Sequence, residues 1–488
     1  MNTHSLTRRE FLKASLAALS SAALPPLDGL SPSPRSSPFH QSTNQQSTNL
    51  LAPNSPNLII ILSDQLRAAS LGCYGNPEID TPNLDRLAAE GARFVNSVTT
   101  SPLCSPARAC LMTGRYKNKT GIIINNLRLP KSEISVAEVM RNAGYLTGYI
   151  GKWHLDGMPP RQYLDPGWVE PKNRQGFQGW TAFNTGHVYY NGHYYKGNDP
   201  TMLTIPEGIY EPDFQTDEAI SFITTNAGRP FFLFLSIGTP HPQNIGRDLP
   251  PGGDYTFPYD ADSLTLRPNV DYPDLAAVRQ EYADYYGIVS NFDWNVGRIL
   301  TILDNLGLAE NTIVAITSDH GDYLGSHYNN VVKLRGKMVI YAESLDVPFI
   351  LRYLHRVAPQ LVNDVFTSVD VMPTLLGMCG LSSPSQVMGR DFTPLLKAGE
   401  PPLDPPYGPV PSTEAAFVNM LDGECIWIGV RTPEYTLECD RYTYEPKRLF
   451  HNSIDPYQLV NYLDDPAYAQ VKEDLHQQLL AWVEYIGL

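Results

Sequence analysis

The stretch at residues 57–64, NLIIILSD, decides the fold class, because it is a short apolar run that stops at a carboxylate. A run of this length without polar alternation is typical of a strand buried on both faces of a parallel sheet. Comparable runs follow at 145–154, 229–242, 311–322 and 346–354. Helical patterns separate them, at 81–94, 135–144 and 281–307. Strands that alternate with helices predict an α/β fold with a large, mostly parallel sheet flanked by helices.

The last hundred residues have a different texture. Residues 395–410 are rich in proline, and 411–450 carry short alternating patterns such as CIWIGVRT and YTLECDRYTYEP. These patterns predict a small antiparallel sheet, and 468–488 closes the chain with a helical pattern. We therefore expect a main domain at 56–395 and a C-terminal subdomain at 396–488.

The first 55 residues predict an export signal and a linker. Arg8 and Arg9 precede a short run of small apolar residues, which resembles a twin-arginine (Tat) signal over 1–26. The alternative is a basic amphipathic helix that belongs to the folded domain. Residues 27–55 are rich in Ser, Pro, Asn and Gln and predict a disordered linker. The protein is thus expected to use the Tat translocon and to be periplasmic or extracellular.

Charge and cysteine content exclude several classes of protein. The chain of 488 residues has 36 Lys and Arg against 51 Asp and Glu, a net charge of −15, which argues against nucleic acid and anionic membranes as partners. A local basic pocket for an anionic substrate stays compatible with this charge. The six cysteines show no CxxC pair, which excludes a zinc ribbon. Cys425 and Cys439 are the candidate disulfide, and buried free thiols are the alternative.

Polar side chains follow four of the apolar runs. They are Asp64 with Gln65, Lys152 with His154, His241, and Asp319 with His320. Each alone is typical of a solvated loop, but ligands of α/β sheets bind beyond the carboxyl ends of the strands. The first and fourth pairs offer mostly oxygen ligands, which suit Ca²⁺ or Mg²⁺, and the imidazole also suits Mn²⁺. Lysine and the other histidines would bind an anion and transfer protons.

Cys104 lies in SPLCSPARACLMTGR, at 101–115. Pro106 is favoured at a helix start, so Cys104 is expected just before a helix N-terminus, where negative charge is stabilised. One interpretation is a buried structural cysteine. A second is a thiolate nucleophile, activated by the helix end and by Arg108.

A third interpretation follows from the motif itself, because Cys-Ser-Pro-Ala-Arg followed by Thr-Gly-Arg resembles the signature of type I sulfatases. The resemblance extends over residues 56–465 and includes GYIGKWHL, TPHPQ, SDHGDYLGSH and GKMVIYAESLDVPFILR. It implies an alkaline phosphatase-like fold with a large mixed sheet, and it makes the 56–395 domain the catalytic one. It also implies that a formylglycine-generating enzyme oxidises Cys104 to formylglycine.

The resemblance also implies a role for each motif residue. Cys104 would be the hydrated formylglycine, steadied by Arg108, and one of its hydroxyls would attack sulfur. A divalent cation, by family habit Ca²⁺, would be held by Asp64, Gln65, Cys104, Asp319 and His320. The sulfate would be surrounded by Lys152, His154, His241 and Lys337. In this scheme Asp319 accepts the proton of the nucleophile, His241 and Lys337 protonate the leaving alkoxide, and His154 takes the proton of the second hydroxyl.

Two departures keep alternatives open. Gln65 and His320 stand where many sulfatases have Asp and Asn, and these variants resemble choline-sulfatase-like and phosphonate monoester hydrolase-like members. The expected activity is hydrolysis of carbohydrate sulfates. The alternatives are a phosphonate or phosphate ester hydrolase, a non-catalytic binding protein and a plain cysteine hydrolase. Lys337 is preferred to the nearby Lys333 because of its Gly-Lys-x-x-x-Tyr-x-Glu-Ser context.

The aromatic stretch at 184–199 is open to two interpretations. It forms either a sugar-binding rim or a surface loop packed on its own tyrosines. His187 and His193 lie in it as possible substrate contacts.

Overall fold

The computed structural model describes residues 55–158, 165–242, 259–328, 334–422 and 425–488. The predicted signal at 1–26 and the predicted linker up to residue 54 lie outside these ranges, as does Lys333. No helix within the described ranges combines the length and the apolar character that a membrane span requires.

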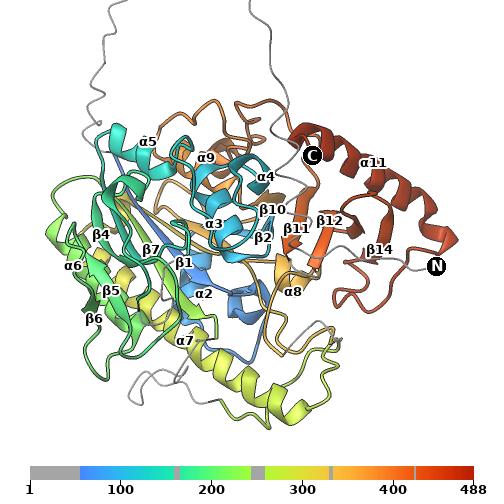
Figure 1. The fold of residues 1–488 in the computed structure, drawn as a ribbon, viewed down its shortest axis with the longest axis horizontal. Coiled ribbons are helices and arrows are strands. Elements are labelled where there is room, and N and C mark those ends of the chain that lie inside the picture. The colour runs from blue at the N-terminus through green and yellow to red at the C-terminus, as the bar shows by residue number, and fades with distance from the viewer. Residues whose placement is uncertain (1–54, 159–164, 243–258, 329–333, 423–424) are drawn as a thin grey trace, which may run out of the picture. The chain divides into compact units, whose positions relative to one another are not determined.

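A mixed sheet forms the centre of the described chain (Figure 1). Its strands, in order across the sheet, are β10 (Gln360–Thr367), β2 (Ala92–Val98), β9 (Phe349–Arg352), β8 (Thr312–Ser318), β1 (Asn57–Asp64), β7 (Phe231–Pro240), β3 (Leu146–Lys152), β4 (Gly179–Phe183), β5 (His193–Lys196) and β6 (Leu203–Thr204). The central strands β8, β1, β7, β3 and β4 are parallel, while β9, β5 and β6 pair in the antiparallel sense. The predicted fold class is confirmed.

Helices cover both faces of the sheet, which explains why β1 is apolar from residue 58 to residue 62. Leu58, Ile60 and Leu62 face the cluster that contains α3 (Cys104–Thr113), α5 (Val136–Asn142) and α9 (Val371–Met378). Ile59 and Ile61 face the cluster that contains α2 (Pro82–Ala89), α6 (Glu211–Thr225) and α7 (Leu275–Asn305). Successive side chains of a strand point to opposite faces, so a strand between two helical layers must be apolar at every position.

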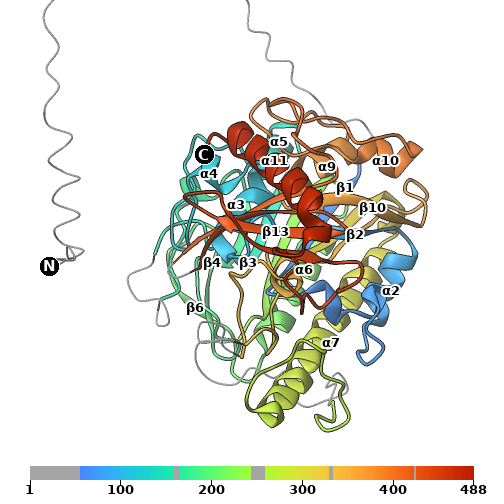
Figure 2. The same ribbon diagram turned by 90° about the vertical axis from the view of Figure 1, so that its right-hand side faces the viewer.

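The four-stranded C-terminal sheet is antiparallel, as predicted. It consists of β11 (Ala416–Asp422), β12 (Cys425–Arg431), β13 (Tyr435–Asp440) and β14 (Pro446–His451). Figure 2 shows α11 (Ala469–Ile486) lying across it. The predicted boundary at residue 395 falls within α10 (Thr393–Ala398), and the division into domains stays a prediction.

Two sequence predictions are wrong. Cys439 is a free thiol that faces Ile428 across the strand pair, so the predicted bond to Cys425 is not formed. The helical pattern at 81–94 ends at Ala89, and β2 begins three residues later. Gly91 lies between them, and a Cβ there would stand 2.2 Å from the carbonyl oxygen of Leu351. Only glycine permits this approach of the chain to β9, which draws the following residues into the sheet.

Strands β4, β5, β6 and β10 were not anticipated from the sequence. The remaining elements are short: α4 (Lys117–Thr120), α8 (Ala342–Leu345), η1 (Ala68–Ser70), η2 (Gly72–Tyr74), η3 (Pro171–Asn173), η4 (Ala309–Asn311) and η5 (Pro466–Tyr468).

Candidate active site

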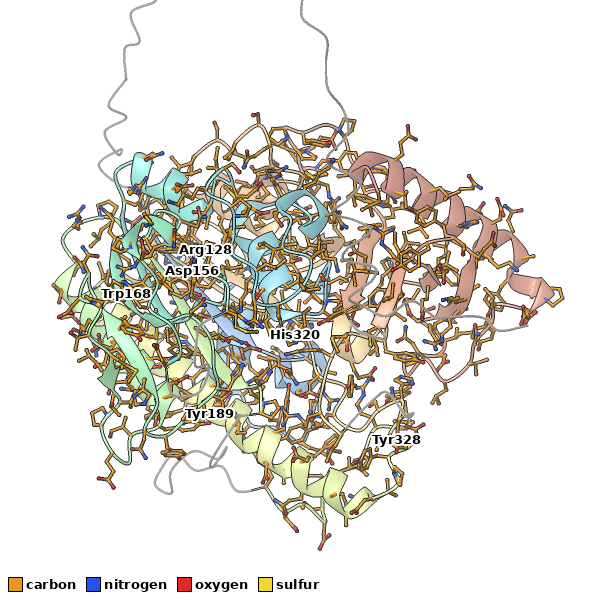
Figure 3. All side chains as sticks on the ribbon, viewed as in Figure 1. Arg128, Asp156, Trp168, Tyr189, His320 and Tyr328 are labelled. Carbon is orange, nitrogen blue, oxygen red and sulfur yellow. The ribbon has the colours of Figure 1, made fainter. Side chains whose placement is uncertain are left out.

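The predicted site residues meet at the carboxyl edge of the central strands. Asp64 ends β1 and accepts a hydrogen bond from Lys152, which ends β3, with 2.6 Å between Oδ2 and Nζ. His241, directly after β7, donates its backbone N–H to the Asp64 carbonyl oxygen at 3.0 Å. Asp319, directly after β8, accepts the backbone N–H of Gln65 at 3.1 Å. Figure 3 labels His320, the residue that directly follows Asp319.

Cys104 is the first residue of α3, so the prediction that it lies just before the helix is wrong by one position. Its N-cap is Leu103, and Pro106 is the third helical residue, still within the first turn that proline tolerates. The Cys104 Sγ atom lies 3.2 Å from His320 Nε2, 3.2 Å from Lys337 Nζ and 3.8 Å from Asp64 Oδ1. The thiol therefore faces a carboxylate, a lysine ammonium and an imidazole.

The surroundings of Cys104 favour its thiolate. Burial and Asp64 raise the pKa of this thiol. The lowering effect of Lys152, Lys337 and His320 is larger, so the pKa falls well below its ordinary value. Burial instead raises the pKa of four other cysteines, Cys73, Cys110, Cys379 and Cys439. Among these thiols, Cys104 has the environment of a reactive one.

Four buried groups, of which Cys104 is one, fit a divalent cation. The ligand atoms of Asp64, Cys104, Asp319 and His320 all lie within 4.8 Å of one another. His320 Nε2 is 3.8 Å from Asp64 Oδ1 and 3.5 Å from Asp319 Oδ1, too far for good hydrogen bonds. His320 Nδ1 lies 3.0 Å from the Gly321 carbonyl oxygen, which can only accept, so Nε2 presents its lone pair to the cluster. This donor set suits a cation that accepts both oxygen and nitrogen ligands.

Arg108 connects the two carboxylates of this cluster. Its guanidinium donates to Asp64 Oδ2 at 3.0 Å and to Asp319 Oδ2 at 3.1 Å, and it is 1% exposed. A further pair of hydrogen bonds reaches the Lys152 carbonyl oxygen and the Ser236 hydroxyl. In the described part of the chain, none of the hydrogen bonds of Arg108 goes to Cys104. Its observed contacts hold the carboxylates, whereas the resemblance implied that it steadies the cysteine.

The two carboxylates have opposite pKa shifts. Burial would raise the pKa of Asp64, but the charges of Lys152 and Arg108 bring it well below the ordinary value. Burial and the neighbouring Asp64 charge raise the pKa of Asp319. Like charges in a buried site disfavour each other's ionisation, which a bound cation would relieve.

Gln65 and Lys337 are brought to the site by residues that the sequence analysis missed. The Gln65 amide accepts from Lys337 Nζ at 3.0 Å and donates to Asp322 Oδ2 at 2.7 Å. Asp322 also accepts from Arg335 Nε at 2.6 Å and from the Gly336 N–H at 3.0 Å. Asp322 thus holds both Gln65 and the segment that carries Lys337. Its place three residues after Asp319, in the SDHGD stretch, was the available signal.

A second group of potential metal ligands surrounds the side-chain ammonium of Lys152. Asp64, His187 and His241 also bring their ligand atoms within 4.8 Å of one another. Lys152 Nζ lies 2.6 Å from Asp64 Oδ2 and 2.9 Å from His187 Nε2, so this cationic group lies against two of the three residues. We therefore assign this group to Lys152 and not to a second metal ion.

The surroundings of three histidines near Lys152, namely His154, His187 and His241, favour the neutral imidazole. Burial, with the charge of Lys152, brings the pKa of His187 well below its ordinary value. Burial, with His187 and Lys337, does the same to His241. Burial and Lys152 lower the pKa of His154 to about 4, and Asn126 Oδ1 lies 3.1 Å from its Nε2. Neutral imidazoles beside a lysine can accept protons.

The aromatic stretch contributes one of its two histidines. His187 is 5% exposed and stacks on His241, with ring centroids 3.7 Å apart and the planes 3° from parallel. His193 lies on β5 and contacts Thr204 Oγ1 at 3.1 Å. Tyr189 is fully buried and packs edge-on against Tyr210. This part of the stretch is packed inside the protein and is not a surface rim.

Comparison with known proteins identifies the family. The Sulfatase family profile matches residues 56–381. An ulvan-active sulfatase of Formosa agariphila is 35% identical, over 88% of this chain and 81% of its own. An endo-4-O-sulfatase of Bacteroides thetaiotaomicron is 31% identical, over 87% and 91%.

A solved structure has the same architecture. It comes from work on the metabolism of multiple glycosaminoglycans by Bacteroides thetaiotaomicron and has a TM-score of 0.76 at 28% identity, over 89% of this chain and 97% of its own. Together with the arrangement around Cys104, these similarities make the chain a sulfuric ester hydrolase that belongs to the sulfatase family.

Proposed function

We propose that the chain hydrolyses sulfate monoesters of carbohydrates at Cys104. The observation that carries this proposal is the convergence of His320 Nε2, Lys337 Nζ and Asp64 Oδ1 on Cys104 Sγ, at 3.2, 3.2 and 3.8 Å. The carbohydrate class is supported by the two relatives, which are named for activity on ulvan and for 4-O-sulfate. A thiol at this point, between anionic and cationic groups, marks the place where a nucleophile meets an anionic ester.

Two added groups would complete the site. We propose that Asp64, Gln65, Asp319, His320 and the oxidised side chain of Cys104 hold a divalent cation, most simply Ca²⁺, which would stabilise negative charge on the sulfate. We also propose that Cys104 is converted to formylglycine, whose hydrate would supply the attacking hydroxyl.

The protein's own side chains then have separate tasks. Lys152 and Lys337 bind sulfate oxygens. Arg108 donates to both Asp64 and Asp319, and its charge favours the ionised form of each carboxylate. His241 holds its Nδ1 proton on the Pro242 carbonyl oxygen at 2.7 Å, so Nε2 of the neutral ring carries a lone pair. The Lys337 ammonium would therefore supply the proton that the leaving oxygen takes up.

His154 is the proton acceptor beside Cys104. With Nε2 placed against Asn126, its Nδ1 makes no hydrogen bond of good geometry within the described ranges. Asp319 would take the proton of the attacking hydroxyl.

The proposal extends to maturation and location. Residues 1–26 would direct export through the Tat translocon to the periplasm or the cell exterior, and 27–55 would tether the catalytic domain at 56–395 and the subdomain at 396–488. A formylglycine-generating enzyme would act on Cys104 before export. These steps rest on the sequence pattern and on the Cys104 motif.

The first test is the chemical state of Cys104. The protein is isolated from its own host, and the tryptic peptide that ends at Arg108 is analysed by mass spectrometry after labelling with an aldehyde-reactive probe. A labelled peptide supports the proposal. An unmodified thiol in active, exported protein overturns the formylglycine step and favours a thiolate hydrolase.

The second test compares transferred groups on esters that share one leaving group. Sulfate, phosphate and phosphonate monoesters of 4-nitrophenol are assayed before and after removal of divalent cations by chelation. We expect the sulfate ester to have the highest kcat/KM and chelation to abolish turnover, with recovery on adding Ca²⁺. A preference for the phosphonate ester would replace the sulfatase assignment with the alternative hydrolase.

A further inference from the structure

Lys152 has two fixed hydrogen-bond acceptors. Its ammonium lies 2.6 Å from Asp64 Oδ2 and 2.9 Å from His187 Nε2, and the side chain is 1% exposed. A lysine ammonium has three N–H donors and no acceptor. Among the described residues these two contacts leave one N–H, and its direction is set by the other two.

His187 contacts Lys152 in a defined tautomer. Because the ammonium can only donate, Nε2 of His187 must be the accepting nitrogen. Its Nδ1 lies 3.2 Å from the hydroxyl of Tyr189, and that hydroxyl lies 2.7 Å from the Gly238 carbonyl oxygen and 2.5 Å from that of His241. The Tyr189 hydroxyl donates to a carbonyl, so its lone pair accepts the Nδ1 proton of His187.

The same ring fixes His241. The two imidazoles are stacked 3.7 Å apart and parallel within 3°, and His241 is further held through its backbone N–H and through Nδ1. The backbone at Gly238 lies close to Tyr189 and His187, since a Cβ there would lie 3.3 Å from Tyr189 Cε1 and 3.6 Å from His187 Nδ1. His187 and Tyr189 thus connect the segment after β4 to the ends of both β3 and β7.

We propose that His187 is a positioning residue, which sets the direction of the Lys152 ammonium through Nε2 and the plane of the His241 ring by stacking. Tyr189 is its support, because its hydroxyl selects the tautomer that leaves Nε2 as an acceptor. The inference rests on the proposed function and adds to it a residue pair outside the sulfatase motifs quoted above. It also explains why a buried histidine in the aromatic stretch reaches the site without needing to touch the sugar.

The test separates the two contacts of the ring by substitution. His187→Gln keeps an acceptor near the position of Nε2 and loses the stacked ring. His187→Phe keeps a ring and loses the acceptor, and His187→Ala loses both. With 4-nitrophenyl sulfate, we expect kcat/KM to fall about 10- to 100-fold in the Ala and Phe variants, the range that loss of an orienting partner produces. The Gln variant should recover most of this loss.

A double-mutant cycle asks whether the effect passes through Lys152. We expect His187→Ala to lower kcat/KM by a clearly smaller factor when Lys152 is already alanine than in wild type, because residues that act as a unit are not additive. The loss that remains belongs to the stack on His241. Multiplicative effects would overturn the proposal, since His187 would then act independently of Lys152. Tyr189→Phe should lower activity in the same direction as His187→Ala.

Controls keep the outcomes distinct. His193→Ala, a histidine of the same segment without a contact to Lys152, should leave kcat/KM unchanged. Thermal unfolding of each variant shows whether it is folded, and the Gln and Phe variants decide the question if the Ala variant does not fold. Equal losses in Gln and Phe would overturn the role of the acceptor. If wild type hydrolyses no sulfate ester, the proposed function fails, and this inference with it.

Discussion

The carboxyl edge of the large sheet and the C-terminal four-stranded sheet differ in where their charged side chains lie. At the edge, Asp64, Arg108, Lys152 and Asp319 are at most 1% exposed and hydrogen-bond one another. On the small sheet, Lys447 and Asp440 form an ion pair at the surface, where their side chains are 48% and 26% exposed. Its interior is apolar and built around Trp482 of α11.

This difference separates function from stability. Burying charge is costly unless every group is paired, so the network at the edge is retained for the chemistry that it performs and not for its contribution to folding. The small sheet gains its stability from apolar burial, which is worth about 25 cal/mol per Å². Substitutions at the edge should therefore reduce activity most, and substitutions in the small sheet should reduce stability.

The largest expected effect is on activity at Cys104. Cys104→Ala removes the proposed nucleophile, and we expect kcat/KM for a sulfate ester to fall by about 10⁴-fold or more, as when a nucleophile is deleted from other hydrolases. Circular dichroism should show a folded protein, because the helix α3 gains a residue with high helix propensity. Activity close to wild type would contradict the place of the reaction.

Arg108→Ala should damage both activity and stability. It leaves the carboxylates of Asp64 and Asp319 without their shared partner, and breaking a buried pair costs about 3–5 kcal/mol. We expect kcat to fall about 100-fold or more as the site loses its geometry. Chemical denaturation and steady-state kinetics measure the two effects. The matched control is Lys447→Ala on the small sheet, where the free energy of unfolding should change by less than about 0.5 kcal/mol.

Trp482→Ala tests the contribution of the apolar core of the small sheet to stability. Trp482 is 2% exposed and packs on Tyr116 and Phe417, with ring centroids 5.8 and 6.2 Å away. Truncation of such a residue costs about 3–5 kcal/mol. The free energy of unfolding should fall by this amount, while kcat/KM measured well below the unfolding transition stays near that of wild type. A large loss of activity in the folded variant would show that the small sheet shapes the site.

The sequence predicted the features that depend on residues close together in the chain. An apolar run, its length and the residue that ends it are properties of neighbours in the chain, so strands β1, β3, β7 and β8 and the residues at their ends were predictable. The Cys104 motif is equally local. The small sheet was predicted because alternating patterns stand close together between Pro-rich and helical segments.

What the sequence did not reveal depends on contacts between distant segments. His187 reaches Lys152 because the chain after β4 crosses to the ends of β3 and β7, and no pattern within 184–199 encodes that crossing. The role of Arg108 was assigned from a motif, whereas its contacts to Asp64 and Asp319 follow from how α3 docks on two strands. The false disulfide has the same origin, because register places Cys439 opposite Ile428.

Lys117 connects the segment that leads to Cys104 with the small C-terminal sheet. Its ammonium donates to Ser101 Oγ at 3.1 Å, three residues before Cys104, and to the carbonyl oxygen of Asn419 on β11 at 3.0 Å. The side chain is 1% exposed, and burial lowers its pKa from 10.5 to about 7. Neither of these two contacts is with a carboxylate, whereas the lysine at the edge of the large sheet, Lys152, is paired with Asp64.

The sign of its pH effect follows from proton uptake on unfolding. Between pH 7 and 10.5 the unfolded chain holds a proton on Lys117 that the folded chain has released, so the free energy of unfolding rises with pH in that window. The rise from one such group is at most about 1.4 kcal/mol per pH unit. Lys117→Met should flatten the difference in unfolding free energy between pH 6.5 and 8.5, whereas Lys447→Met should not change it. An equal slope in wild type and Lys117→Met would show that Lys117 keeps its charge when the two sheets dock.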